Sequence, residues 1–442
     1  MEYKQRSIRN GYSKISKNFS SMNEKMDHLI LFDLFDQLCA CSDSSTDSIV
    51  ETLTNIQEKC KNKMDLEYLQ CYNVERFAIF LFGLIKSDNH DLIETSLKTI
   101  KSMTTIENAF EQGLIKSGII CLLKEMITLN SDSNTMKLIY MIIGNLIDYS
   151  SDVYLEIRDI VSEQFIPMVN QCLQQPFAYL VLCATRYKEF AHELLDYISK
   201  FYARAIESEY RVLLLSLTRI FEALDRDFDY LILEEMSIYR FIDDMLTPRE
   251  LIEKKLIEAQ VNSCICITYL LEKSPVIPPV SYDKIMDFAL VIGHSKLNMQ
   301  AIITLRALRI HDRFRDEISL DFVTRIIQFS INIDFESKKW YIAFICTTLL
   351  YEDAECSIFL IKNDVLSLLN EGLYIEDLRK EVLFTLLRIF ENLELLGAVY
   401  STADSFSSID VEVILSIQDG DDYHLATLAA EVYSKISCSF EE

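Results

Sequence analysis

Apolar side chains recur every three or four residues along successive stretches of this chain, the spacing of helices that bury one face. Two of these stretches are nearly the same: residues 217–224 read LTRIFEAL and residues 386–393 read LLRIFENL. Six of the eight positions are identical, and the two segments lie 169 residues apart, which is four periods of about 42 residues. A repeat of this length is typical of proteins built from stacked helical units.

Helical stretches of similar character begin at ten places: near Asp47, Asp91, Asn134, Phe177, Glu209, Ile257, Asn298, Lys338, Arg379 and Tyr423. The starts span 376 residues in nine steps, so the mean step is about 42 residues. This spacing excludes the shorter tetratricopeptide and ankyrin repeats and leaves HEAT-type helix pairs as a competing interpretation. The sequence therefore predicts an all-α, right-handed superhelix of about ten repeats.

Three helices are predicted within the clearest unit, at residues 106–116, 119–129 and 134–149. Gly118 separates the first two, because a sharp break between packed helices favours a residue that tolerates left-handed backbone angles. Asn363 is predicted to do the same in a later unit, since asparagine is also tolerant of positive φ. The third helix of each unit is apolar around much of its circumference, which indicates that neighbouring units cover it on both sides.

The charge of the chain limits its partners. Its 442 residues include 43 Lys and Arg against 68 Asp and Glu, a net charge of −25, so attraction to nucleic-acid phosphates is not expected. Residues 1–28 carry a net +3 and are predicted to be a flexible basic arm. Nine Gly and six Pro leave little material for linkers, so residues 29–442 are predicted to form a single helical repeat domain that favours a basic or neutral partner.

No other class of function has a clear signal. The longest uninterrupted apolar stretch, residues 77–85, is far below the ~18 residues of a membrane span, so no membrane insertion is expected. The N-terminus lacks the apolar core of a secretory signal, which favours the cytoplasm or nucleus. The twelve cysteines and six histidines are dispersed and no catalytic motif is present, so we expect no metal, no cofactor and no enzyme activity.

Residues 109–148 read AFEQGLIKSGIICLLKEMITLNSDSNTMKLIYMIIGNLID and resemble an armadillo repeat, with a short helix, a leucine-rich second helix and a third helix ending in GNL. Gly118 and Asn145 stand where that family places its glycine and asparagine. Residues 359–394 resemble a second copy, with Asn363 and Asn392 in those places. When the 42-residue period is used to place further copies of the repeat, the resemblance covers about residues 30–440. It implies a protein scaffold without enzyme activity that binds another protein or an extended peptide along a concave groove lined by third helices.

The importin-α-like version of this family places a tryptophan four residues before each asparagine, where it helps to hold basic cargo. This chain has Met141 and Arg388 four residues before its two asparagines, and Arg219 at the corresponding place in residues 217–224. Arginines in the groove would repel basic cargo, and residues 1–28 lack the arginine cluster of the importin-β-binding arm that they otherwise resemble. A divergent nuclear transport adaptor is therefore kept as the alternative function.

Six residues are predicted to bind the partner: Asn145, Arg219, Trp340, Phe344, Arg388 and Asn392. The asparagines would hold a peptide backbone, or else cap the ends of their own helices. The arginines would bind carboxylates of the partner, or else pair with Glu222 and Glu391 one turn away. The two aromatic residues would anchor the partner, or else form core between repeats. A solenoid that assembles with copies of itself, and an enzyme without a recognisable motif, also stay open.

Overall fold

The computed structural model describes residues 30–40, 45–60, 74–105, 110–129, 132–170, 174–202, 207–247, 254–311 and 318–440. Every regular element in these ranges is a helix, and none of the helices there is long and apolar enough to cross a membrane. The predicted basic arm, residues 1–28, lies outside them. The chain divides into two compact units, Met1–Ser216 and Leu217–Glu442, so a single domain over residues 29–442 stays a prediction.

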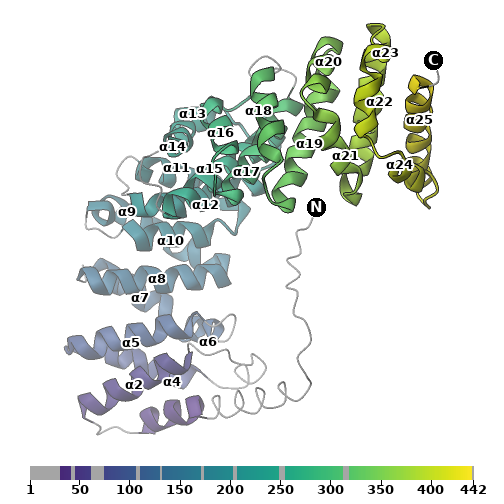
Figure 1. The fold of residues 1–442 in the computed structure, drawn as a ribbon. Coiled ribbons are helices and arrows are strands. Elements are labelled where there is room, and N and C mark those ends of the chain that lie inside the picture. The colour runs from purple at the N-terminus through teal and green to yellow at the C-terminus, as the bar shows by residue number, and fades with distance from the viewer. Residues whose placement is uncertain are drawn as a thin grey trace. The chain divides into compact units, whose positions relative to one another are not determined.

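In the first unit, long helices follow and pack against one another (Figure 1). Residues 30–40 are helical. The helices that follow are α2 (Thr46–Cys60), α4 (Glu75–Ile85), α5 (His90–Met103), α6 (Glu111–Lys116), α7 (Ile119–Thr128), α8 (Ser133–Tyr149), α9 (Ser151–Asn170), α10 (Gln174–Ala184) and α11 (Ala191–Tyr202). Helix α5 packs on α2, α8 on α5 and α10 on α8. The core therefore lies between successive helices, as it does in a stack of repeats.

The second unit continues this pattern. Helix α12 (Glu207–Ala223) contains the boundary, and it is followed by α13 (Ile232–Glu235), α14 (Ile238–Met245), α15 (Lys254–Lys273), α16 (Tyr282–Ala289), α17 (Ser295–Ile310), α18 (Leu320–Ser330), α19 (Phe335–Tyr351), α20 (Ala354–Lys362), α21 (Val365–Leu373), α22 (Arg379–Leu395), α23 (Val399–Thr402), α24 (Val411–Gln418) and α25 (Tyr423–Phe440). Helices α15, α17, α19, α22 and α25 pack each on the next (Figure 1).

The predicted positions of the long helices agree with the structure. Each of the ten predicted starts lies between zero and three residues after the first residue of an observed helix, namely α2, α5, α8, α10, α12, α15, α17, α19, α22 and α25. Helix α19 is buried on all sides over Tyr341–Leu349, as expected for a helix covered by neighbours on both sides. The prediction of an all-helical solenoid-type arrangement is confirmed.

The junctions between first and second helices were predicted correctly in one case and wrongly in another. Gly118 has a φ of 90° and directly precedes α7, as expected. Asn363 has a φ of −104° and ends α20, whereas Asp364, with a φ of 67°, is the left-handed residue before α21. Aspartate tolerates this conformation about as well as asparagine does. The residue types of Asn363 and Asp364 therefore did not show which of the two would be left-handed. Ser237, with a φ of 58°, occupies a third such junction, before α14.

We expect Ser237→Gly to raise the free energy of unfolding by about 1 kcal/mol, because glycine avoids the steric cost of a Cβ in the left-handed region. Ser416→Gly, in the ordinary helix α24, is the matched control and should lower it by a similar amount. Urea unfolding followed by circular dichroism measures both changes. A loss of stability in both variants would contradict the argument from backbone strain.

Candidate functional site

An exposed surface with both aromatic and basic side chains lies on the long helix α22. Lys380, Phe384 and Arg388 follow at four-residue intervals, so they lie on one face of this helix. The Phe384 side chain is 43% exposed, and Lys380 is also exposed. A large aromatic side chain exposed between two basic ones is suited to contact with another molecule.

A hollow of about 530 Å³ lies beside this face. Leu350, from the end of α19, and Phe384 supply its apolar surface. Asp377, Lys380 and Glu381, from the turn before α22 and its first turn, supply charged groups. The hollow is wide open, so it suits a side chain that another molecule projects into it better than an enclosed small substrate.

Both carboxylates of the hollow are already paired with cations. Lys339 donates a hydrogen bond to Asp377, which lowers the pKa of that carboxyl group. Arg306 of α17 donates from Nη2 to Glu381 Oε1 at 2.8 Å, and from Nε to Thr347 Oγ1 at 3.0 Å. Since Glu381 belongs to α22 and Thr347 to α19, this network joins three successive long helices.

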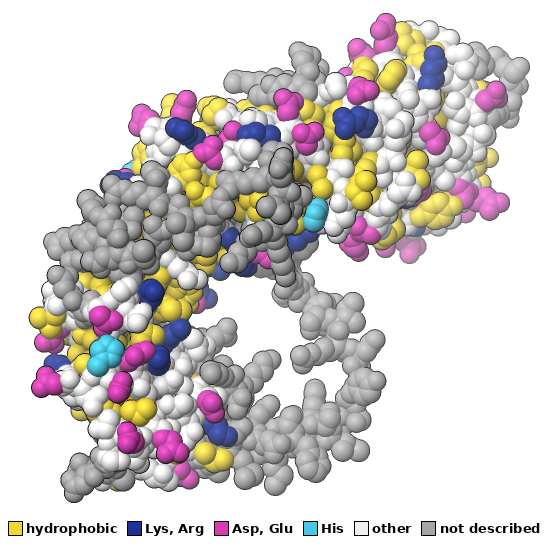
Figure 2. Space-filling model, turned by 60° about the vertical axis from the view of Figure 1, so that its left-hand side comes forward, with side chains coloured by type: hydrophobic (Ala, Val, Ile, Leu, Met, Phe, Trp, Pro, Cys, Tyr) yellow, Lys and Arg dark blue, Asp and Glu magenta, His cyan; other side chains and the backbone are white. Residues whose placement is uncertain are grey.

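Lys380 differs from these residues, because it forms no ion pair with any residue that the structure describes. The uncompensated charge at the hollow is therefore positive. Acidic and basic side chains are interspersed on the face drawn in Figure 2. Exposed ion pairs such as Arg388–Glu391 and Lys435–Glu394 occur elsewhere in this unit. A ligand that brings a carboxylate to Lys380 would complete the charge balance of the hollow.

None of the six sequence-predicted residues lines this hollow. Arg388 lies two turns beyond Lys380 on the same face, but its Nη1 pairs with Glu391 at 3.0 Å, the intrahelical alternative considered above. Arg219 is exposed on α12. Phe344 is fully buried, with its ring centroid 6.4 Å from that of Phe322, and Trp340 is half-buried near the start of α19.

The two predicted asparagines are buried between helices. Asn145 Nδ2 donates to Thr104 Oγ1 at 2.9 Å, and the Tyr179 hydroxyl donates to Asn145 Oδ1 at 2.6 Å. Asn392 Nδ2 donates to Ser357 Oγ at 2.8 Å. Neither asparagine caps the end of its own helix. Each one links its long helix to a hydroxyl group in or directly after an earlier helix, so these side-chain hydrogen bonds are internal to the chain.

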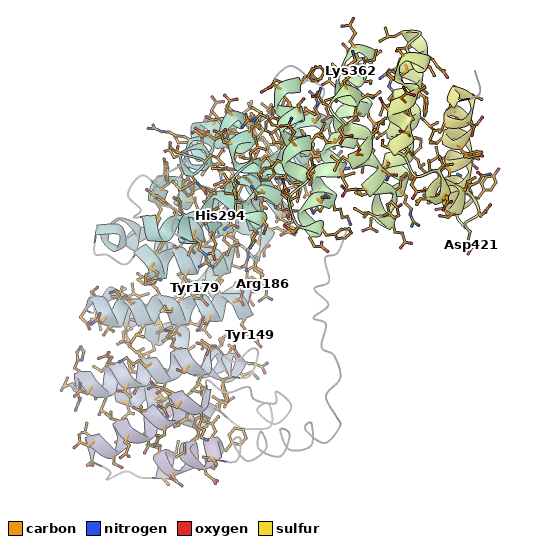
Figure 3. The ribbon with its side chains drawn as sticks, in the orientation of Figure 1. Tyr149, Tyr179, Arg186, His294, Lys362 and Asp421 are labelled. Atoms are coloured by element: carbon orange, nitrogen blue, oxygen red, sulfur yellow. The ribbon has the colours of Figure 1, made fainter. Side chains whose placement is uncertain are left out.

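A polar cavity of about 330 Å³ surrounds Asn145 in the first unit. Figure 3 shows Tyr149 at the end of α8, Tyr179 on α10 and Arg186 just after α10, all of which line it. Arg186 Nη1 donates to the backbone oxygen of Asp148 at 2.5 Å and lies 3.2 Å from its carboxylate. Burial raises the pKa of Tyr179, so its phenol stays protonated as the donor to Asn145. The internal pairing makes this cavity a weaker candidate than the hollow at α22.

Metal-ligand clusters and buried thiols are the next features to consider among the described residues. No group of three or more His, Cys, Asp or Glu side chains among them could hold a metal ion. Burial raises the pKa of the Cys264, Cys266 and Cys346 thiols to about 12, so they are protonated and unreactive at neutral pH. The Cys121 and Cys438 thiols, by contrast, are exposed, so not every described cysteine belongs to the core.

Sequence reasoning missed Lys380, Phe384 and Leu350. The sequence did contain a signal for this site. Phe384 lies four residues from both Lys380 and Arg388, a spacing that places an aromatic ring between two basic side chains on one helix face. The sequence alone did not show whether that face was covered by a neighbouring helix.

Comparison with known proteins gives a fold and no family. No family model matches the chain, and no curated protein matches it. Among 184 matching chains of solved structures is the crystal structure of an engineered protein from the Northeast Structural Genomics Consortium, with a TM-score of 0.66 and 12% sequence identity. The match covers 92% of this chain and 99% of that chain. At this identity the likeness concerns the fold alone, and it supports a helical solenoid over nearly the whole sequence.

Proposed function

We propose that this chain is a scaffold without enzyme activity that binds a polypeptide partner along the exposed faces of its third helices. In this proposal the chain is an armadillo-type, right-handed solenoid of about ten repeats, as its 42-residue period and the resemblance of residues 109–148 suggest. The observation that carries the proposal is the exposed Phe384 beside an open hollow on a long helix. Stacked repeats expose such faces in series and thereby favour extended ligands.

The hollow favours a partner with two kinds of side chain. An apolar side chain would cover Phe384 and Leu350, and burying a side chain of this size contributes about 1.5–3 kcal/mol. A neighbouring Asp or Glu would pair with Lys380 through a charge-assisted hydrogen bond. This local preference differs from the basic or neutral partner predicted from the net charge of −25. That charge slows the approach of an acidic peptide, but close contacts decide the affinity because charges beyond ~8 Å are screened.

The alternative of a nuclear transport adaptor is not favoured at this surface. Basic cargo would meet the uncompensated charge of Lys380, and residues 1–28, the other part of that hypothesis, lie outside the described residues. Localisation in the cytoplasm or nucleus stays a prediction.

The test uses a random-peptide display library selected on the wild-type chain. Phe384→Glu should weaken binding of the selected peptides at least tenfold, because it removes the ring and places a carboxylate beside the hollow. Phe359→Glu is the matched control, since Phe359 is 41% exposed on α20 and does not line the hollow. It should leave binding unchanged.

Two results would contradict the proposal. One is equal binding of the selected peptides to the Phe384→Glu and Phe359→Glu variants. The other is light scattering that shows a dimer in the wild type and a monomer only in Phe384→Glu. That result would make this face the contact of a self-assembling solenoid in place of a peptide receptor.

A further inference from the structure

A second cavity of the Leu217–Glu442 unit, about 390 Å³, lies between the turns that precede α17 and α19. The apolar side chains of Ile292, Phe329 and Ile333 line it, and none of its described lining residues carries a formal charge. Its volume is at the lower end of the ~300–1,000 Å³ of small-molecule pockets. Such a cavity is large enough for one ring system, and it would not compensate a charged ligand for lost hydration.

Asn298 gives this cavity a directional polar group. Its side chain is almost completely buried, with a residue exposure of 4%. Nδ2 donates to the backbone oxygens of Phe288 at 2.7 Å and Val291 at 2.8 Å, so both amide hydrogens are used at the end of α16. These two carbonyl groups fix the orientation of the amide, because only its nitrogen can donate to them.

The remaining atom of this amide, Asn298 Oδ1, accepts no hydrogen bond from any residue that the structure describes. This oxygen is not fully buried, although the residue as a whole is, so it is open to a donor that enters the cavity. Asn298 therefore offers an acceptor with a fixed orientation in an uncharged cavity, whose other polar lining residues are Ser295, Asn332 and Ser337. A ligand with a single N–H or O–H group on an apolar ring would satisfy it.

The surroundings of the cavity allow access from solvent. Ile292 is 87% exposed in the turn next to His294, which Figure 3 labels. Ile331 and Phe335, 63% and 65% exposed, flank the lining residues Asn332 and Ile333 in the sequence. Exposed apolar side chains in adjacent turns give an entering ring a surface to cover.

We infer that this cavity binds a neutral aromatic ring carrying one hydrogen-bond donor, for which indole is the model. The ring contacts Ile292, Phe329 and Ile333, and its N–H donates to Asn298 Oδ1. The inference is independent of the peptide site at α22. The same chemistry is available from a tryptophan or tyrosine side chain of a partner polypeptide and from a free small molecule.

The test compares indole with benzofuran, which has the same shape but a ring oxygen in place of the N–H group. Indole should bind about tenfold more tightly in ligand-observed NMR titrations of the full chain, because benzofuran cannot donate to Asn298. Ile292→Ser should weaken both probes, and the fold should tolerate it since this side chain is mostly exposed. Ile310→Ser, 54% exposed and outside the cavity, is the control and should weaken neither.

A third probe, N-acetyltryptophanamide, separates the two sources of the ring. Displacement of indole by this probe assigns a polypeptide side chain as the ligand, and its failure to displace bound indole assigns a free small molecule. The inference is overturned if indole and benzofuran bind equally, if Ile292→Ser changes neither, or if neither probe binds at about 5 mM.

Discussion

Replacing Glu352 with alanine is expected to lower the free energy of unfolding by about 3–5 kcal/mol. Its carboxylate forms an ion pair with Arg309, whose side chain is fully buried near the end of α17. A guanidinium group cannot lose its proton in a protein, so the variant would keep a buried positive charge without the carboxylate that neutralises it. Chemical denaturation followed by circular dichroism measures the loss.

Two further variants separate the ion pair from a general effect of the substitution. Glu355→Ala, at an exposed position on α20, should change stability by less than about 0.5 kcal/mol. Arg309→Met combined with Glu352→Ala should recover much of the loss, because methionine fills most of the space of the arginine side chain and leaves no buried charge to desolvate. Equal stability of the Glu352→Ala and Glu355→Ala variants would show that the buried pair contributes little.

The arginines of α17 illustrate how far the sequence predicts such contacts. Arg306 and Arg309 are three residues apart in an apolar helix, and their spacing alone places both on roughly the same side. In the structure the Arg306 side chain is 29% exposed at the face shared with α19 and α22, whereas that of Arg309 is fully buried. The difference depends on where Glu381 and Glu352 lie, and these acids belong to later helices that the local pattern does not specify.

The fold could be predicted from local sequence patterns, whereas the contacts at the candidate site could not. Helix positions were predictable because each long helix repeats an apolar pattern at nearly constant spacing, and packing between neighbours preserves that register. The partners of the two asparagines were not predictable, since Thr104 and Ser357 lie 41 and 35 residues before Asn145 and Asn392. Exposure of Phe384 was equally hidden, because it depends on which face of α22 its neighbours leave open.

Replacing Gly372 with alanine is expected to lower the free energy of unfolding by about 1–3 kcal/mol. Gly372 lies in α21, where the helix approaches both α19 and α22 closely. A Cβ atom at this position would come within 2.7 Å of Val382 Cγ2 and 2.9 Å of Ile342 Cγ2. Both neighbours are fully buried, so they have little room to move away. Thermal and urea unfolding of the full chain measure the loss.

Gly83→Ala is the matched control, because it makes the same change at a helical glycine with nothing within 4 Å of the added Cβ atom. Alanine has the higher helix propensity, so this variant should gain about 0.5–1 kcal/mol. Opposite signs for the two substitutions would show that close packing of successive helices, and not backbone flexibility, requires glycine at residue 372. A gain of stability in both variants would mean that α21 can shift away from α19 and α22 at little cost, and the stack would then be less tightly packed than its geometry indicates.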